Sequence, residues 1–110
     1  MRSLVLAAIV AACASQPDPA VPPLPAGDAA LGRAYAEAAC ASCHAVAPGE
    51  NFSPHMQAPA FIDIANTPGM THRALDVWLH SVHPSMPHLI VERERIEDLS
   101  AYLATLQREH

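Results

Sequence analysis

CASCH, at residues 40–44, is the stretch that decides the fold of this 110-residue chain. Two cysteines separated by two residues can each form a thioether with a vinyl group of a haem, and the histidine that follows can ligate the iron. A zinc site would need further Cys or His ligands at a suitable spacing, and the remaining cysteine, Cys13, lies far upstream in an apolar segment. A redox disulfide of the thioredoxin type would lie near a β-α-β pattern, and no segment here has the pattern of a strand. We therefore predict one covalent haem c, attached to Cys40 and Cys43 and ligated by His44.

The composition indicates that such a haem would form much of the core. The chain has room for one small domain, but it contains only 2 Phe, 2 Tyr and 1 Trp. A small domain with few large side chains has a thin core, which a covalently held haem would fill. The 11 Asp and Glu residues outnumber the 6 Arg residues. This balance excludes the basic footprint of a nucleic-acid-binding protein, and it suits a basic or neutral docking partner, or solubility alone.

Residues 1–13 are predicted to be a signal peptide with a lipobox. The apolar run at residues 4–12 is shorter than the roughly 20 residues that cross a bilayer, but it fits the central part of a signal peptide. The sequence VAAC, which ends at Cys13, resembles a bacterial lipobox, in which the cysteine is lipidated and becomes the mature N-terminus. The alternative is ordinary cleavage after Ala14 at a small-residue site.

Residues 14–26 are predicted to be a proline-rich linker. They contain five prolines and almost no side chain able to pack. Such a segment favours polyproline II geometry with about 3.1 Å per residue, which gives a reach of roughly 40 Å. A linker of this length would hold a domain away from a membrane, although it could also be a tail with no mechanical role. The folded domain is then predicted to span residues 27–110.

The first part of this domain is predicted to be a helix that runs into CASCH. Asp28 is a suitable N-cap. Gly32 lies inside the helix at a cost of about 1 kcal/mol, so we expect close packing against another helix. The apolar residues at helical spacing are Leu31, Tyr35 and Ala38. Residues 45–58 lack a clear period and are predicted to form a loop over one face of the haem.

Three further helices and no strands are predicted, which makes the domain all-α. A short helix covers residues 59–65 with Pro59 at its first position. A third helix follows Thr71 and ends at Pro84, and the last runs from about 92 to 107 with a poor N-cap. Their apolar residues are Phe61, Ile64, Leu75, Trp78, Leu79, Val82, Ile96, Leu99, Tyr102, Leu103 and Leu106.

The second iron ligand is expected in the sequence HPSMPH at residues 83–88. Prolines on both sides of Met86 restrict the backbone to extended geometry, so its thioether would approach a metal from a fixed direction. Met86 could instead be a core residue, as most methionines are. The rival ligands are the thioethers and imidazoles of Met56, Met70, His83 and His88.

Residues 27–108 resemble a class I monohaem cytochrome c. The resemblance rests on the helix ending in CASCH, the irregular middle, the methionine beside a proline and the last amphipathic helix. It implies an all-α fold of about four helices around one haem, with Met86, 42 residues after His44, as the distal iron ligand. Class II cytochromes carry the motif at the C-terminus of a four-helix bundle and do not fit.

The same resemblance implies two contacts. The first and last helices cross at a small residue, which Gly32 could supply, against Leu99 and Tyr102. A proline carbonyl, for which Pro59 is the candidate, accepts a hydrogen bond from the free ring N–H of His44.

Function follows as an expectation from these ligands. Axial His and Met raise the reduction potential and leave no open position for a substrate, so we expect an electron-transfer protein and not an enzyme. It would be exported to the periplasm, tethered to the membrane through Cys13, and would shuttle electrons between redox proteins that the sequence does not name. The alternatives are a haem sensor or peroxidase-like enzyme in which Met86 dissociates, and a fixed subunit of a larger redox complex.

The remaining polar and aromatic residues are expected to have no chemical role. Trp78 is interpreted as a packing residue, and Asp63 and Asp76 have no evident partner for acid–base chemistry. The histidines expected to be solvated are His55, His72, His80 and His110.

Overall fold

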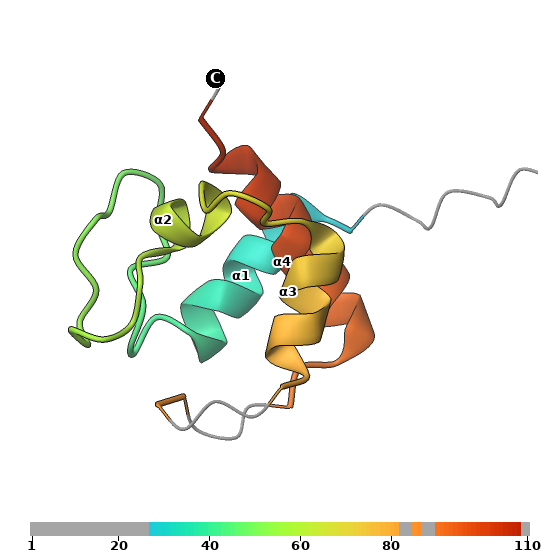
Figure 1. Cartoon of the computed structure of the whole chain (residues 1–110), viewed down its shortest axis with the longest axis horizontal. Helices are drawn as coiled ribbons and strands as arrows, with labels where there is room; N and C mark the ends of the chain where they lie inside the picture. Colours follow the sequence, from blue (N-terminus) through green and yellow to red (C-terminus); the bar gives the residue numbers. More distant parts are fainter. Residues whose placement is uncertain (1–26, 82–84, 87–89, 109–110) are drawn as a thin grey trace, which may run out of the picture.

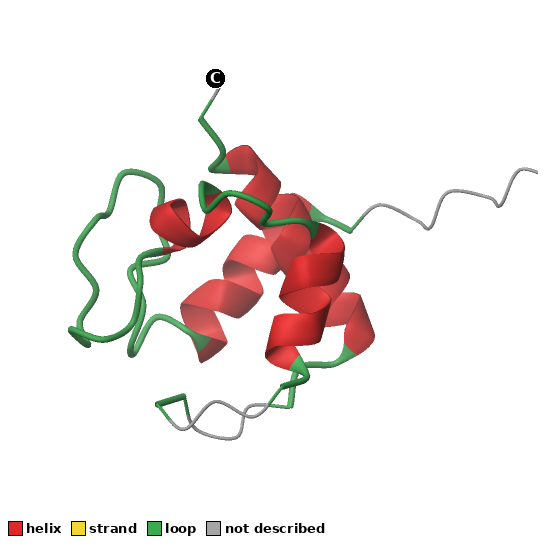
Figure 2. Ribbon diagram, in the orientation of Figure 1, coloured by secondary structure: helices red, strands yellow, loops and turns green. Residues whose placement is uncertain are grey.

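The computed structural model describes residues 27–81, 85–86 and 90–108 (Figure 1). Within these residues the chain forms four helices and no strand (Figure 2). The helices are α1 (Ala29–Ala39), α2 (Phe61–Ala65), α3 (His72–Leu79) and α4 (Arg93–Thr105). The prediction of an all-α domain with four helices is confirmed. The predicted signal peptide, Cys13, the linker, and the residues Val82, His83, Pro84, His88 and His110 lie outside the described residues.

Helices α1 and α4 cross in close contact, and both α2 and α3 pack against α4. A Cβ atom added to Gly32 would come 2.0 Å from the carbonyl oxygen of Asp98, so only glycine fits at this crossing. The start of α1 is also tied to α4. The backbone N–H of Asp28 donates to Asp98 Oδ1 at 2.8 Å, and Asp28 caps the helix by accepting from the Leu31 N–H at 3.0 Å.

The close packing predicted at Gly32 is confirmed, but the rest of the buried face of α1 differs from the prediction. Gly32 and Ala36 are buried, whereas Leu31 is 52% exposed and Ala38 is exposed. The physical reason is the short distance between the helices, since only small side chains fit where two backbones approach closely. Tyr35, also predicted to face the core, is half-buried beside the crossing, with the Arg95 guanidinium 5.6 Å from its ring centroid.

Helix α2 begins at Phe61, two residues later than predicted, because Ala60 precedes it as an N-cap residue in extended geometry. Its C-terminal end is fixed by Asn66. The side-chain N–H groups of Asn66 donate to the carbonyl oxygens of Ile62 at 2.7 Å and Leu106 at 3.0 Å. This residue therefore ties the end of α2 to the end of α4.

Helix α3 begins as predicted and ends earlier. The Thr71 hydroxyl accepts from the Ala74 N–H at 3.1 Å, but the last helical residue is Leu79. Side chains beyond Leu79 contact the last backbone carbonyls of the helix. His80 Nδ1 lies 2.8 Å from the backbone oxygen of Asp76, and the Ser81 hydroxyl donates to the backbone oxygen of Val77 at 2.6 Å. The Ser81 hydroxyl thus satisfies the Val77 carbonyl, which the Ser81 N–H would have bonded in a continuing helix, because that N–H instead donates to the Trp78 carbonyl.

Helix α4 provides the largest part of the core. Its predicted apolar face is confirmed, because all five residues are buried: Ile96, Leu99, Tyr102, Leu103 and Leu106. The poor N-cap is also confirmed, since Glu92 occupies that position without a side-chain hydrogen bond to the helix. Packing of the apolar face, and not capping, therefore holds this helix in place.

We expect Gly32→Ala to lower the free energy of unfolding by about 3 kcal/mol or more, because the added methyl meets backbone atoms that cannot move aside. Ala34→Ser, at an exposed position of α1, should cost no more than about 0.5 kcal/mol. Guanidinium unfolding of the haem-loaded protein, followed by circular dichroism, measures both values. An equal loss in the two variants would contradict the close crossing.

Candidate haem site

The CASCH motif forms a compact turn at the end of α1. Cys40 is the C-cap residue of the helix. Its carbonyl accepts from the N–H of Cys43 at 3.1 Å and from that of His44 at 2.9 Å. Cys40 is buried and Cys43 is half-buried, and both thiols are free. Burial, with a smaller contribution from Cys43, raises the pKa of the Cys40 thiol to about 11.

The imidazole of His44 is held by residues on either side of the start of α2. Its Nδ1 lies 2.7 Å from the carbonyl oxygen of Pro59, as predicted. The ring of Phe61 meets the imidazole edge-on, with 5.6 Å between the ring centroids. A histidine whose Nδ1–H donates to a carbonyl has its tautomer and orientation set, and the lone pair of Nε2 remains available to a metal.

A cavity of about 380 Å³ adjoins this imidazole. Its walls come from several elements: Cys40 and His44 from the motif, Leu75 and Trp78 from α3, and Leu99 from α4. The volume lies within the range of small-molecule and cofactor sites, and most of the lining side chains are apolar. Such walls suit the flat apolar ring of a haem.

The donor set also fits a haem. Within the described parts of the chain, no group of three or more His, Cys, Asp or Glu residues could hold a metal ion. The cavity offers one imidazole and the thioethers of Met70 and Met86, a set that does not suit a bare ion, whereas an imidazole and one thioether would suffice for a haem iron, because the porphyrin nitrogens supply its remaining ligands. The residues present therefore fit the group that the sequence predicts.

The candidate thioether ligands differ in their position relative to the cavity. Met70 and Met86 are both half-buried and both line it, whereas Met56 is 100% exposed to solvent on the loop. The structure thus brings Met86 into one cavity with His44, and it leaves Met56 outside.

Three other sequence predictions concern residues around this cavity. Trp78 lines it but is 48% exposed, so it is less buried than a core residue. Asp63 also borders the cavity and is exposed, while Asp76 lies on α3 with its Oδ1 3.3 Å from His80 Nδ1. The histidines expected to be solvated that the structure describes are all exposed: His55, His72 and His80.

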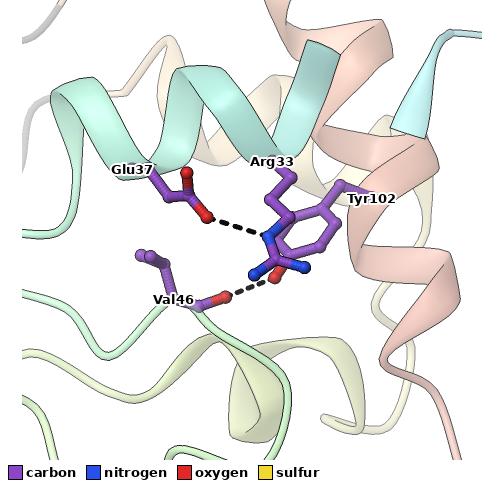
Figure 3. Close-up of polar contacts among 4 residues, drawn as sticks. All are labelled: Arg33, Glu37, Val46 and Tyr102. Carbon is purple, nitrogen blue, oxygen red and sulfur yellow. Dashed lines mark hydrogen bonds and ion pairs between the residues drawn. The ribbon is translucent and has the colours of Figure 1, made fainter. Parts of the chain in front are cut away.

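Two contacts near the site were not predicted from the sequence. Both hold the proximal loop, which is defined here as residues 45–58. Figure 3 shows the Tyr102 hydroxyl reaching from α4 to the Val46 carbonyl, at 2.5 Å, beside the Arg33–Glu37 ion pair. Burial raises the pKa of Tyr102, so the phenol stays protonated and donates. The sequence feature that could have indicated this contact is a tyrosine in the apolar face of a helix, since a buried Tyr hydroxyl requires a hydrogen-bond partner.

The second missed contact involves Ser53, whose hydroxyl oxygen accepts from the backbone N–H of Ala45 at 2.9 Å. Ser53 lies in a segment without periodicity, so no local pattern distinguished it from a solvated serine. Only the return of the loop toward the motif brings the two residues together.

Comparison with known proteins relates the chain to cytochrome c-552 of Bradyrhizobium diazoefficiens, with 34% identity over 82 residues. The matched region covers 74% of this chain and 78% of that protein. No family model and no solved structure matches the chain. The likeness extends over most of both proteins and agrees with the helical fold and the motif described above. The chain therefore belongs to the cytochrome c family, the c-type haem proteins of electron transfer, and the four helices of its described part form the class I fold.

Proposed function

We propose that this protein carries electrons in the periplasm through one haem c bound to Cys40 and Cys43, with His44 and Met86 as the axial ligands. The observation that carries the proposal is the oriented imidazole of His44, which borders the same apolar cavity as Met86. In metal sites, a ligating histidine almost always donates its other ring N–H to a carbonyl, a carboxylate or water, and His44 has this arrangement.

The side chains define what this site can do. A bound haem c would supply the one-electron couple of ferric and ferrous iron. As a ligand, the soft thioether of Met86 would favour the ferrous state and raise the reduction potential. If His44 and Met86 both held the iron, no position would be open to a substrate, and outer-sphere electron transfer would be favoured over catalysis.

The surroundings of these ligands favour fast electron transfer. The apolar walls, which include Leu75, Leu99 and Leu103, would keep water from a bound haem and make the dielectric response around it small. The Pro59 carbonyl holds the His44 ring in one orientation in both oxidation states. Little rearrangement of the protein would therefore accompany a change of charge on the iron.

We also propose export, with a lipid anchor on Cys13 and a linker at residues 14–26 leading to the domain. The capped start of α1 supports this boundary, because Asp28 and its bond to Asp98 follow the linker directly. No helix in the described part of the chain is long and apolar enough to cross a membrane. The partners would be redox proteins, and the excess of acidic residues suits a basic or neutral docking face.

The covalent attachment predicts that haem stays with the polypeptide during acid–acetone extraction and on a haem-stained denaturing gel. Replacing both Cys40 and Cys43 with Ala should remove the stain, because no thioether can then form. Ser42→Ala, within the same turn, should retain it. Complete extraction of haem from the natural protein would disprove covalent attachment.

The axial ligand predicts the behaviour of three methionine variants. Ferric haem with a thioether ligand has a weak far-red charge-transfer band, and Met86→Ala should abolish it, lower the reduction potential and let carbon monoxide bind the reduced iron. Met56→Ala is the exposed control, and Met70→Ala is the control within the cavity wall. Both should keep the band, the potential and the resistance to carbon monoxide.

Two outcomes would contradict the assignment of Met86. Loss of the band in Met70→Ala with retention in Met86→Ala would move the ligand to Met70. A natural protein without the band and with ready carbon monoxide binding would favour a sensor or peroxidase-like role.

The anchor predicts the cellular location of the protein. Cys13→Ser should shift the protein from the membrane fraction to the soluble periplasmic fraction, or leave an unprocessed precursor, because no thiol remains for the lipid. Fractionation with immunoblotting measures this. A natural protein that is already soluble and begins at Ser15 would show cleavage after Ala14 instead.

A further inference from the structure

The proximal loop returns to the haem motif and holds both peptide groups beside His44. On one side, the Cys43 carbonyl accepts from the backbone N–H of His55 at 3.1 Å. On the other, the Ala45 N–H donates to the side chain of Ser53 at 2.9 Å. The backbone of the histidine is therefore held from the same short segment at two points.

The ring of His44 is held by the residue that follows this loop, through the 2.7 Å contact between Nδ1 and the Pro59 oxygen. Ala45 connects the contacts that hold the backbone beside His44 with those that hold its ring. Its carbonyl accepts from the Phe61 N–H at 2.8 Å, and the Phe61 ring lies edge-on to the imidazole. A shift of Ala45 would thus move both neighbours of the ring.

Ser53 differs from the residues around it in the loop. Among residues 48–57, all of which the structure describes, it is half-buried and every other residue is exposed. Its partner Ala45 is only 3% exposed. Water could not easily replace the hydroxyl, and loss of a partner for a buried N–H costs about 1–3 kcal/mol.

We propose that Ser53 is a positioning residue for the proximal iron ligand. Its hydroxyl fixes Ala45, and through Ala45 and Phe61 it keeps the His44 ring aligned with the Pro59 carbonyl. This inference rests on the proposed role of His44. A hydrogen bond from Nδ1 to a carbonyl makes the imidazole a more basic ligand, which stabilises ferric iron, so misalignment of this bond raises the reduction potential.

The test compares Ser53→Ala with two matched variants in the reduced, haem-loaded protein. Ser53→Thr keeps the hydroxyl. Thr105→Ala removes an exposed hydroxyl that donates to the Tyr102 carbonyl at 2.6 Å, away from the cavity. Hydrogen exchange of the Ala45 amide and of the His44 Nδ1–H, followed by NMR, reports the local contact, and redox titration reports its effect on the iron.

In the natural protein the Ala45 amide should be protected relative to the amides of the exposed loop residues. Ser53→Ala should accelerate exchange at Ala45 and at His44 Nδ1 by about 10-fold or more, the factor that corresponds to loss of this buried contact, and it should raise the reduction potential. Ser53→Thr should keep the slow exchange and the reduction potential of the natural protein, and Thr105→Ala should change neither.

Several results would overturn the proposal. An unprotected Ala45 amide in the natural protein would do so even if Ser53→Ala failed to fold. Equal acceleration of exchange throughout α4 would reveal a general loss of stability, and an unchanged potential would separate Ser53 from the iron. If His44→Ala kept the natural low-spin haem spectrum, the proposed function itself would fail, a result distinct from any of these.

Discussion

The contact between α1 and α4 at Gly32 is the constraint on which the rest of the structure depends. The backbone of Asp98 occupies the space where any larger residue would place its Cβ. Because α1 runs from this crossing to Cys40, the crossing fixes where the haem motif lies, about 12 Å farther along the helix axis. Helix α4 also presents Leu99 and Leu103 to the cavity. The contact between the two helices therefore positions both the wall formed by the motif and the wall formed by α4.

The irregular half of the domain is attached to this helical pair by polar contacts. The proximal loop has few buried side chains, so its backbone groups find partners in side chains. Ser53 accepts from Ala45, and Tyr102 of α4 donates to Val46 across 56 residues of sequence. These bonds hold the loop after His44 in place without a hydrophobic core of its own.

The core of the domain is arranged around the cavity. Leu75, Leu99 and Leu103 are buried and also line it, so a bound haem c would complete their packing. The same apolar side chains therefore contribute to the stability of the domain and form the walls of the candidate haem site.

The sequence by itself determined the features that depend on local patterns. CASCH indicated the haem site, Asp28 and Thr71 identified two helix starts, and the apolar period of α4 predicted its buried face. Pro59 as the partner of His44 came from the family resemblance and is confirmed by the 2.7 Å contact.

Only the tertiary structure decided which apolar residues of α1 are buried and which loop residue holds the backbone beside His44. Close packing at Gly32 was predicted, but hydrophobic periodicity favoured Leu31 and Ala38 as its buried neighbours, and the close approach of a second backbone buried Ala36 instead. The contact of Ser53 likewise depends on the path of the chain, since it joins residues eight positions apart in a loop without periodicity. Local sequence patterns indicate which side chains favour burial within one element, whereas contacts between distant segments depend on how the whole chain is packed.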